Sequence, residues 1–468
     1  MKLTRRSLLS GVAAPAILQR PRNKPNILFL LSDDHSYPYL GVYGAKWMST
    51  PTLDRLAAEG LRFDRMFTSS PQCVPSRAAF MTGQSPVAVR VGRFNTPLPP
   101  DVKSLPEYLR DLGYYTGVCG RYFHLDGVIK AGPITQRVYE KYGLKTWNKR
   151  VDYLDVSPQG QTPARFREFL ARVPKNTPWF FWINFSDPHH VWDKDAGRVN
   201  PAAIELPPHL PDLPGVREDL ARYCGEIERL DSLVAENLEV LRKSGQEDNT
   251  LVVFTGDNGM AFPHGKGSLY DPGIHVPLIV RWPGRGRTGV TDALISGEDI
   301  APTFIEAAGG KAPERMTGRS FLGLITGGPY EPRKYIFAQR LHHGNQPFTA
   351  NTKSSGFDLG RCVRSDRWKL IYNCTPYMEY QPTDSARDPG WQQIVQAHAE
   401  GKLPPALDRA YFQRPRPVIE LYDLTADPGE LNNLAGDPNC KAIQEELIAA
   451  LTEKMIIDFD FLPPPTAD

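Results

Sequence analysis

The chain has few cysteines, no long apolar run and little net charge. Its 468 residues include six cysteines, none of them in the CxxC spacing typical of zinc sites. A formal net charge of +2 gives no support for binding nucleic acid, so we expect no such partner. No apolar run is long enough to cross a bilayer, and we expect no integral membrane segment. The 41% hydrophobic and 23% charged residues are typical of a globular protein.

The N-terminus has the features of an export signal. Lys2, Arg5 and Arg6 precede the short apolar stretch 8–16, which ends in small residues. The segment 4–9, Thr-Arg-Arg-Ser-Leu-Leu, resembles a twin-arginine signal, which exports folded proteins. We therefore predict that residues 1–20 form a bacterial export signal and that the protein is periplasmic or extracellular.

Several apolar runs predict strands that are buried on both faces. The runs are 26–31, 114–118, 178–185 and 250–255. Each is followed by polar side chains, and open α/β sheets bind ligands beyond the carboxyl ends of their strands. Apolar residues at three- and four-residue steps over 220–241 predict a long helix lying on the sheet. We expect the polar strand ends to meet at one edge.

The stretch 70–83, Ser-Pro-Gln-Cys-Val-Pro-Ser-Arg-Ala-Ala-Phe-Met-Thr-Gly, predicts a loop that enters a short helix. Pro75 and Ser76 suit a first helical turn. Cys73 would lie at the positive end of this helix, with Arg77 one turn further on, which favours an anion. A lone cysteine is more often a buried structural residue, so its neighbours decide the interpretation.

Cys-Val-Pro-Ser-Arg at 73–77, followed by Ala-Ala-Phe-Met-Thr-Gly, resembles the sulfatase signature. The resemblance implies that a maturation enzyme oxidises Cys73 to formylglycine, whose hydrated gem-diol is the nucleophile. It also implies an α/β, alkaline-phosphatase-like fold: a large mixed sheet flanked by helices, with a smaller C-terminal antiparallel sheet plus helix. A sulfated carbohydrate would be the substrate.

The same resemblance implies a calcium site. The paired acids after the first strand and the Asp-Asn pair after the strand at 250–255 match the family's metal ligands. Oxygen donors with several carboxylates suit Ca²⁺ better than Mg²⁺. The implied ligands are Asp33, Asp34, residue 73, Asp257 and Asn258.

Four further residues match catalytic positions of the family. His124 and His189 match its two histidines, and Lys266 matches a basic residue that contacts the sulfate. Arg121 stands where the family usually has lysine; arginine keeps the charge but offers a planar fork. His190 is expected at the surface.

The segments Gly-Asp-Asn-Gly-Met-Ala-Phe-Pro at 256–263 and Leu-Tyr-Asp-Leu at 421–424 resemble the heparan N-sulfatase (N-sulfoglucosamine sulfohydrolase) branch. That branch has lysine near the first histidine and arginine in the later loop, the reverse of Arg121 and Lys266. N-sulfoglucosamine is the leading substrate and an O-sulfated sugar end the alternative.

We predict a catalytic domain over 24–330 and an α+β subdomain over 331–468. Within the latter, 375–417 is expected to be a long loop region. We expect the substrate pocket's wall to come from this subdomain, including 375–417 and the stretch His342–His343. The sequence leaves the oligomeric state open, with a homodimer as one option.

Three alternatives remain at this stage. The first is a phosphodiesterase or phosphonate monoester hydrolase of the same superfamily. The second is a non-catalytic, glycan-binding relative, and the third is a cysteine hydrolase that uses an intact thiolate.

Overall fold

The structure is a computed structural model that describes residues 24–94, 96–127, 132–194, 196, 199–342 and 357–465. The predicted export signal, residues 1–20, lies outside the described residues. No described helix is both long and apolar enough to cross a membrane.

Within the described residues, nine strands form a large mixed sheet. Its centre is a parallel set in the order β3-β5-β1-β6, and β7 then pairs antiparallel with both β6 and β2. In spatial order the strands are β4 (Tyr153–Leu154), β3 (Tyr115–Gly120), β5 (Trp179–Asn184), β1 (Asn26–Ser32), β6 (Thr250–Gly256), β7 (His275–Arg281), β2 (Leu61–Phe67) and β8 (Gly289–Thr291), with β9 (Ile295–Ser296) also on β2.

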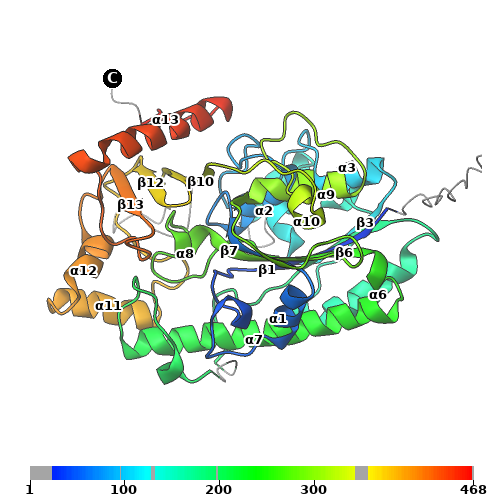
Figure 1. Cartoon of the computed structure of the whole chain (residues 1–468), viewed down its shortest axis with the longest axis horizontal. Coiled ribbons are helices and arrows are strands. Elements are labelled where there is room, and N and C mark those ends of the chain that lie inside the picture. Colours follow the sequence, from blue (N-terminus) through cyan, green and yellow to red (C-terminus); the bar gives the residue numbers. More distant parts are fainter. Residues whose placement is uncertain are drawn as a thin grey trace, which may run out of the picture.

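Helices cover both faces of this sheet (Figure 1). Leu28 and Leu30 of β1 pack into the core on one face, whereas Ile27, Phe29 and Leu31 pack into the core on the other. The first face carries α1 (Pro51–Ala58), α6 (Thr162–Arg172) and α7 (Pro214–Lys243); the second carries α2 (Cys73–Thr82), α3 (Leu105–Asp111), α9 (Ile300–Ala307) and α10 (Leu322–Thr326). The other described α-helices in this part are α4 (Pro133–Lys141), α5 (Trp147–Arg150) and α8 (Asp271–Ile274).

A second, antiparallel sheet follows in the order β10-β11-β12-β13. Its strands are β10 (Ile336–Arg340), β11 (Gly360–Arg364), β12 (Trp368–Asn373) and β13 (Ile419–Asp423). Helix α13 (Lys441–Ile457) packs over it through Leu447, Leu451 and Met455 (Figure 1). The predicted fold class, a large mixed sheet flanked by helices with a smaller antiparallel sheet and helix, is confirmed.

The prediction of a long loop region over 375–417 is wrong in part. Two helices, α11 (Pro389–Ala399) and α12 (Pro405–Phe412), lie within it. Their prolines occupy the first turn, where the missing N–H leaves no hydrogen bond unmade. Trp391, Ile394, Leu407 and Tyr411 are buried in the core that α7 also contributes to.

Strand β2 was also not predicted. Its sequence, Leu-Arg-Phe-Asp-Arg-Met-Phe, has three charged residues among seven. Arg62 and Asp64 pair with each other, Nε to Oδ1 at 2.8 Å, while Phe63, Met66 and Phe67 are buried. The apolar residues alternate with charged ones, as is typical of a strand with one exposed face, and the high charge is why the sequence did not predict a strand here.

The packing of α11 on α7 gives a stability prediction. Ile394→Ala should lower the free energy of unfolding by about 2–5 kcal/mol, because it leaves a cavity at a fully buried position. Val395→Ala, at the neighbouring position where the side chain is 37% exposed, is the control and should change it by less than about 0.5 kcal/mol. Denaturant unfolding of both variants measures the difference. Equal effects would contradict the placement of α11.

Candidate functional site

Four neighbouring parallel strands of the large sheet end in the predicted site. Asp33 and Asp34 follow β1, and Asp257 and Asn258 follow β6. Arg121 follows β3, and β5 ends at Asn184 before the turn that carries His189. The carboxyl ends of parallel strands share one edge of the sheet, so residues more than 200 positions apart come into contact.

Arg77 holds this edge together from the first turns of α2. Its Nε donates to Asp257 Oδ2 at 2.8 Å, and its Nη1 donates to Asn184 Oδ1 and to the carbonyl of Arg121, both at 2.9 Å. Its Nη2 lies 3.2 Å from Asp33 Oδ2. The side chain is fully buried, and its contacts reach the ends of four strands.

Cys73 is the first residue of α2 and is fully buried. Its Sγ lies 3.3 Å from Asp33 Oδ1 and 3.8 Å from Asp34 Oδ1. Burial raises the pKa of the Cys73 thiol well above its ordinary value, and the negative charge of Asp33 raises it further. The unmodified side chain is therefore a thiol at neutral pH, which does not suit thiolate catalysis.

The acids of the site differ in charge state. Burial alone would raise the pKa of Asp33, but the guanidinium groups of Arg121 and Arg77 outweigh it and hold that pKa well below its ordinary value. Burial, with the nearby charge of Asp33, raises the pKa of Asp257 to about 7. One carboxylate is thus fixed in the charged form while the other can exchange a proton near neutrality.

Asp33, Asp34, Cys73 and His189 form a cluster that could hold a metal ion, with one ligand atom from each within 4.8 Å of the others. Asn258 lies beside this cluster: its Nδ2 donates to Asp34 Oδ1 at 2.8 Å, and its buried Oδ1 has no hydrogen-bond partner among the described residues. Carboxylate and amide oxygens are ligands that a hard cation prefers.

Asp257 lies beside this cluster and is already hydrogen-bonded. Its Oδ1 accepts from the backbone N–H groups of Asp34 and Asn258 at 3.0 and 2.8 Å, and its Oδ2 accepts from Arg77. Ser76 donates to its backbone carbonyl. Asp257 thereby holds the backbone at Asp34 and Asn258 in place.

Two cationic side chains each pair with a different acid of the site. Arg121 Nη1 lies 2.8 Å from Asp33 Oδ2, and Lys266 Nζ donates to Asp34 Oδ2 at 2.8 Å. Lys266 is almost fully buried; its acidic neighbours outweigh burial and raise its pKa well above the ordinary value. Both side chains are therefore positively charged.

The two predicted histidines have neutral rings in this arrangement. Burial, and then the charge of Lys266 at 3.3 Å from Nε2, lowers the pKa of His189. Burial, together with Arg77 and Arg121, lowers that of His124 well below its ordinary value, and its Nδ1 has no hydrogen-bond partner in the part of the chain that the structure describes. His190 is not at the surface as expected: its side chain is 9% exposed and pairs with Asp388 at 2.8 Å.

The chain is similar to known proteins over most of its length. The family model described as "Sulfatase" matches residues 25–310, which include every predicted site residue. A second model, described as "N-sulphoglucosamine sulphohydrolase, C-terminal", matches residues 262–407. The chain belongs to the sulfatase family.

Relatives of this sulfatase include an ulvan-active sulfatase of Formosa agariphila, 31% identical over 449 residues, which are 89% of this chain and 72% of the relative. Human N-sulphoglucosamine sulphohydrolase is 29% identical over 477 residues, which are 92% of this chain and 88% of that protein. These family members hydrolyse sulfuric ester and related bonds, so the chain is a sulfatase enzyme, and the second model and the human relative support its resemblance to the N-sulfoglucosamine branch.

Solved structures show the same fold. A protein in complex with its substrate D-glucosamine-2-N,6-O-disulfate has a TM-score of 0.70 at 20% identity, over 95% of this chain and 100% of that one. The phosphonate monoester hydrolase of Silicibacter pomeroyi has a TM-score of 0.69 at 21% identity, over 93% of this chain and 96% of that one.

Sequence reasoning missed two residues that contact this sulfatase site. Asn184, the last residue of β5, accepts from Arg77, and its position at a strand end was a usable signal. Asp384 lies 2.8 Å from Lys266 Nζ; it belongs to the segment 375–417 expected at the pocket wall, but no local pattern singled out this residue. His343, named with His342 as part of the pocket wall, lies outside the described residues.

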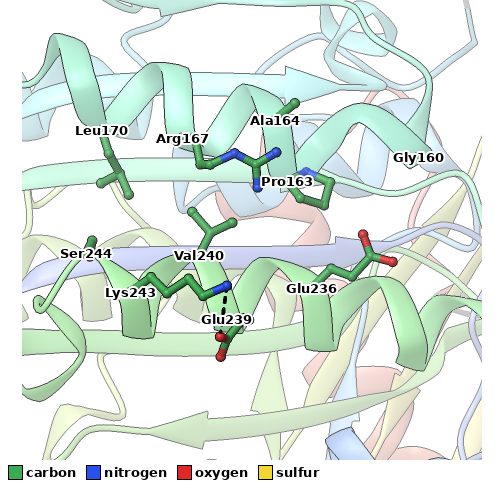
Figure 2. A pocket seen from close by; sticks show the side chains of 10 residues that line it. All are labelled: Gly160, Pro163, Ala164, Arg167, Leu170, Glu236, Glu239, Val240, Lys243 and Ser244. Atoms are coloured by element: carbon green, nitrogen blue, oxygen red, sulfur yellow. Dashed lines mark ion pairs between the residues drawn. The ribbon is translucent and has the colours of Figure 1, made fainter.

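A separate pocket of about 500 Å³ lies between α6 and α7 (Figure 2). Its lining includes Arg167, Glu236 and the ion pair of Glu239 with Lys243 at 3.3 Å. None of the predicted site residues lines it, and it lies on the helical layer rather than at the strand ends.

Proposed function

We propose that this sulfatase removes sulfate from the ends of sulfated glycans, as a sulfate ester or a sulfamate, with N-sulfoglucosamine as the leading substrate. The observation that carries the proposal is the convergence of Arg121, Lys266 and the N-terminus of α2 around Cys73. Such a cluster of positive charge suits an anion with several equatorial oxygens. The match to the C-terminal model of N-sulphoglucosamine sulphohydrolase supports the choice of sugar.

We propose that residue 73 acts as formylglycine after oxidation by a maturation enzyme. Oxidised and hydrated, it would supply a hydroxyl nucleophile and later release the sulfate by elimination. The unmodified thiol would be a poor nucleophile, because burial and the neighbouring acids keep it protonated. The tight packing of residues 73–77 fixes the direction in which the nucleophile points.

We propose that Asp33, Asp34, Asn258 and residue 73 hold a calcium ion, with Asp257 as a further oxygen ligand. The unpartnered Asn258 Oδ1 and the adjacent carboxylates support this. The ion would neutralise charge on the sulfate oxygens.

The remaining roles, sulfate binding and proton transfer, would fall to side chains of the protein. Arg121 and Lys266 bind the sulfate oxygens, and Asp257 or Asp34 is positioned to accept the nucleophile's proton. His189 is neutral beside Lys266; an arriving sulfate anion favours its protonated form, which then donates to the leaving atom. His124, kept neutral by burial and by the arginines, acts as the base for the elimination step.

We also propose that residues 1–20 direct export, that 24–330 form the catalytic domain and that 331–468 form a subdomain. The break between the two sheets near residue 330 supports the domain boundary.

Cys73→Ser should remove nearly all turnover, because serine cannot form the gem-diol that releases sulfate. Cys374→Ser, a half-buried cysteine outside the site, is the control and should keep its activity. Mass spectrometry of the peptide spanning residues 62–90 from native material should show formylglycine at position 73. An active fraction that carries only unmodified cysteine would rule out the mechanism, and inactivation by iodoacetamide would favour the thiolate hydrolase.

Asp33→Ala should lose bound calcium and activity together, by more than about 100-fold in turnover, because one carboxylate is a large part of a hard-ion site. Chelation should lower the thermal stability of the wild type; metal at 100 times its Kd contributes about 2.7 kcal/mol. Asp101→Ala, an exposed acid paired with Arg90, is the control. An active, metal-free Asp33→Ala protein would contradict the site.

N-sulfoglucosamine should be turned over faster than 6-O-sulfated N-acetylglucosamine when kcat/KM is measured side by side. The reverse result, with no turnover of the first sugar, would overturn the substrate and leave the sulfatase assignment in place. Hydrolysis of a bis-aryl phosphodiester to a phenol and an aryl phosphate, faster than the hydrolysis of any sulfate ester, would instead support the phosphodiesterase alternative.

A further inference from the structure

The turn that follows β1 has an unusual backbone conformation at Asp34. Its φ is 61°, in the left-handed region that residues other than glycine adopt at a cost. In this conformation its Oδ1 accepts from Asn258 Nδ2 and its Oδ2 from Lys266 Nζ, both at 2.8 Å, and Cys73 Sγ lies 3.8 Å from Oδ1. The strained residue is thus the one whose carboxylate meets three other groups of the site, and the surrounding structure must hold it there.

Tyr223 of α7 holds this turn through its hydroxyl group. The hydroxyl donates to the backbone carbonyl of Asp34 at 3.1 Å and accepts from the backbone N–H of Ser36 at 3.0 Å. The side chain is fully buried, and its ring packs against Tyr39 and Phe262, with ring centroids 5.3 and 5.7 Å apart. Because the ring is packed in place, the hydroxyl keeps a fixed position between these two backbone groups.

A buried tyrosine hydroxyl usually finds a hydrogen-bond partner, so the two bonds alone do not show a role. The identity of the partners does. Among the described residues, Tyr223 is the only hydrogen-bond partner of the Asp34 carbonyl and of the Ser36 N–H. Without the hydroxyl, two buried backbone groups would lose their partner, and the turn could pair them again only by changing its conformation.

We propose that Tyr223 is a positioning residue for the metal site, which sets the left-handed conformation of Asp34 before the ion binds. The proposal rests on the calcium site that forms part of the proposed function. A ligand that is already in its binding conformation does not have to be ordered when the ion arrives, and this strengthens binding. Tyr223 acts through the backbone of Asp34, as residues outside the ligand set of a metal commonly do when they orient its ligands.

The test measures the calcium affinity of the full-length, matured enzyme by isothermal titration calorimetry, after chelation has removed its metal. Tyr223→Phe removes the hydroxyl and keeps the ring, so its Kd for calcium should rise about 10- to 100-fold. Tyr114→Phe is the matched control, because Tyr114 is also buried and its hydroxyl donates to the carbonyl of Pro25 at 2.8 Å, at the other end of β1. The Kd of this control should stay close to that of the wild type.

The outcomes separate the inference from the proposed function. A rise of less than about fivefold in Tyr223→Phe, or an equal rise in Tyr114→Phe, overturns the role of Tyr223 and leaves the calcium site in place. A wild-type enzyme that binds no calcium overturns the proposed metal site and this inference with it. Thermal unfolding gives the temperature range in which all three proteins are folded, and the titrations are made within it.

A second measurement needs no variant. Hydrogen exchange of the wild type after chelation, followed by mass spectrometry, should show that the backbone amide of Ser36 is already protected, because Tyr223 rather than the ion holds the turn. An amide that becomes protected only when calcium is added would overturn the proposal.

Discussion

The buried guanidinium of Arg77 joins carboxylates that would otherwise repel each other. Asp33 and Asp257 lie on two adjacent strands, both fully buried, and Arg77 contacts each at 3.2 Å or less. Removal of one partner of such a buried pair destabilises a protein strongly, because the other charge is left unpaired. The position of α2 therefore depends on the acids, and the position of Cys73, its first residue, depends on α2.

The same charge balance explains how acids can accumulate at this edge without unfolding it. Arg121 pairs with Asp33 and Lys266 with Asp34, so each acid of the metal cluster has a cation of its own. The pKa values diverge accordingly: that of Asp33 is lowered and that of Asp257 is raised to about 7. Divergent pKa values among neighbouring groups are characteristic of acid–base sites.

The central strands and the site could be predicted from the sequence because each signal was local. The runs at 26–31 and 250–255 are apolar throughout, as strands buried on both faces must be, and their acids follow directly. Residues 73–77 carry a dense pattern within a single helical turn. Parallel pairing then places these strand ends together without any information about tertiary contacts.

Features that depend on tertiary contacts could not be predicted. Helix α11 forms within the segment predicted to be a loop, because Trp391 and Ile394 pack into the core that α7 contributes to. Asp384 is an isolated acid in a polar segment, and only the folding of that segment against His190 brings it to Lys266. The order of the strands along the sheet, with the antiparallel β7 between β6 and β2, likewise has no local signature.

The small sheet fixes the loop that carries Lys266. Asp271, at the start of α8, pairs with Arg364 of β11 and Lys369 of β12, at 3.1 and 2.5 Å. Tyr270 donates to Glu420 of β13 at 2.8 Å. These contacts lie four and five residues after Lys266, and Asp384 holds Lys266 itself. Because Cys73 and the neighbouring acids are held by the large sheet and α2, changes in the C-terminal part can move Lys266 while Cys73 keeps its position.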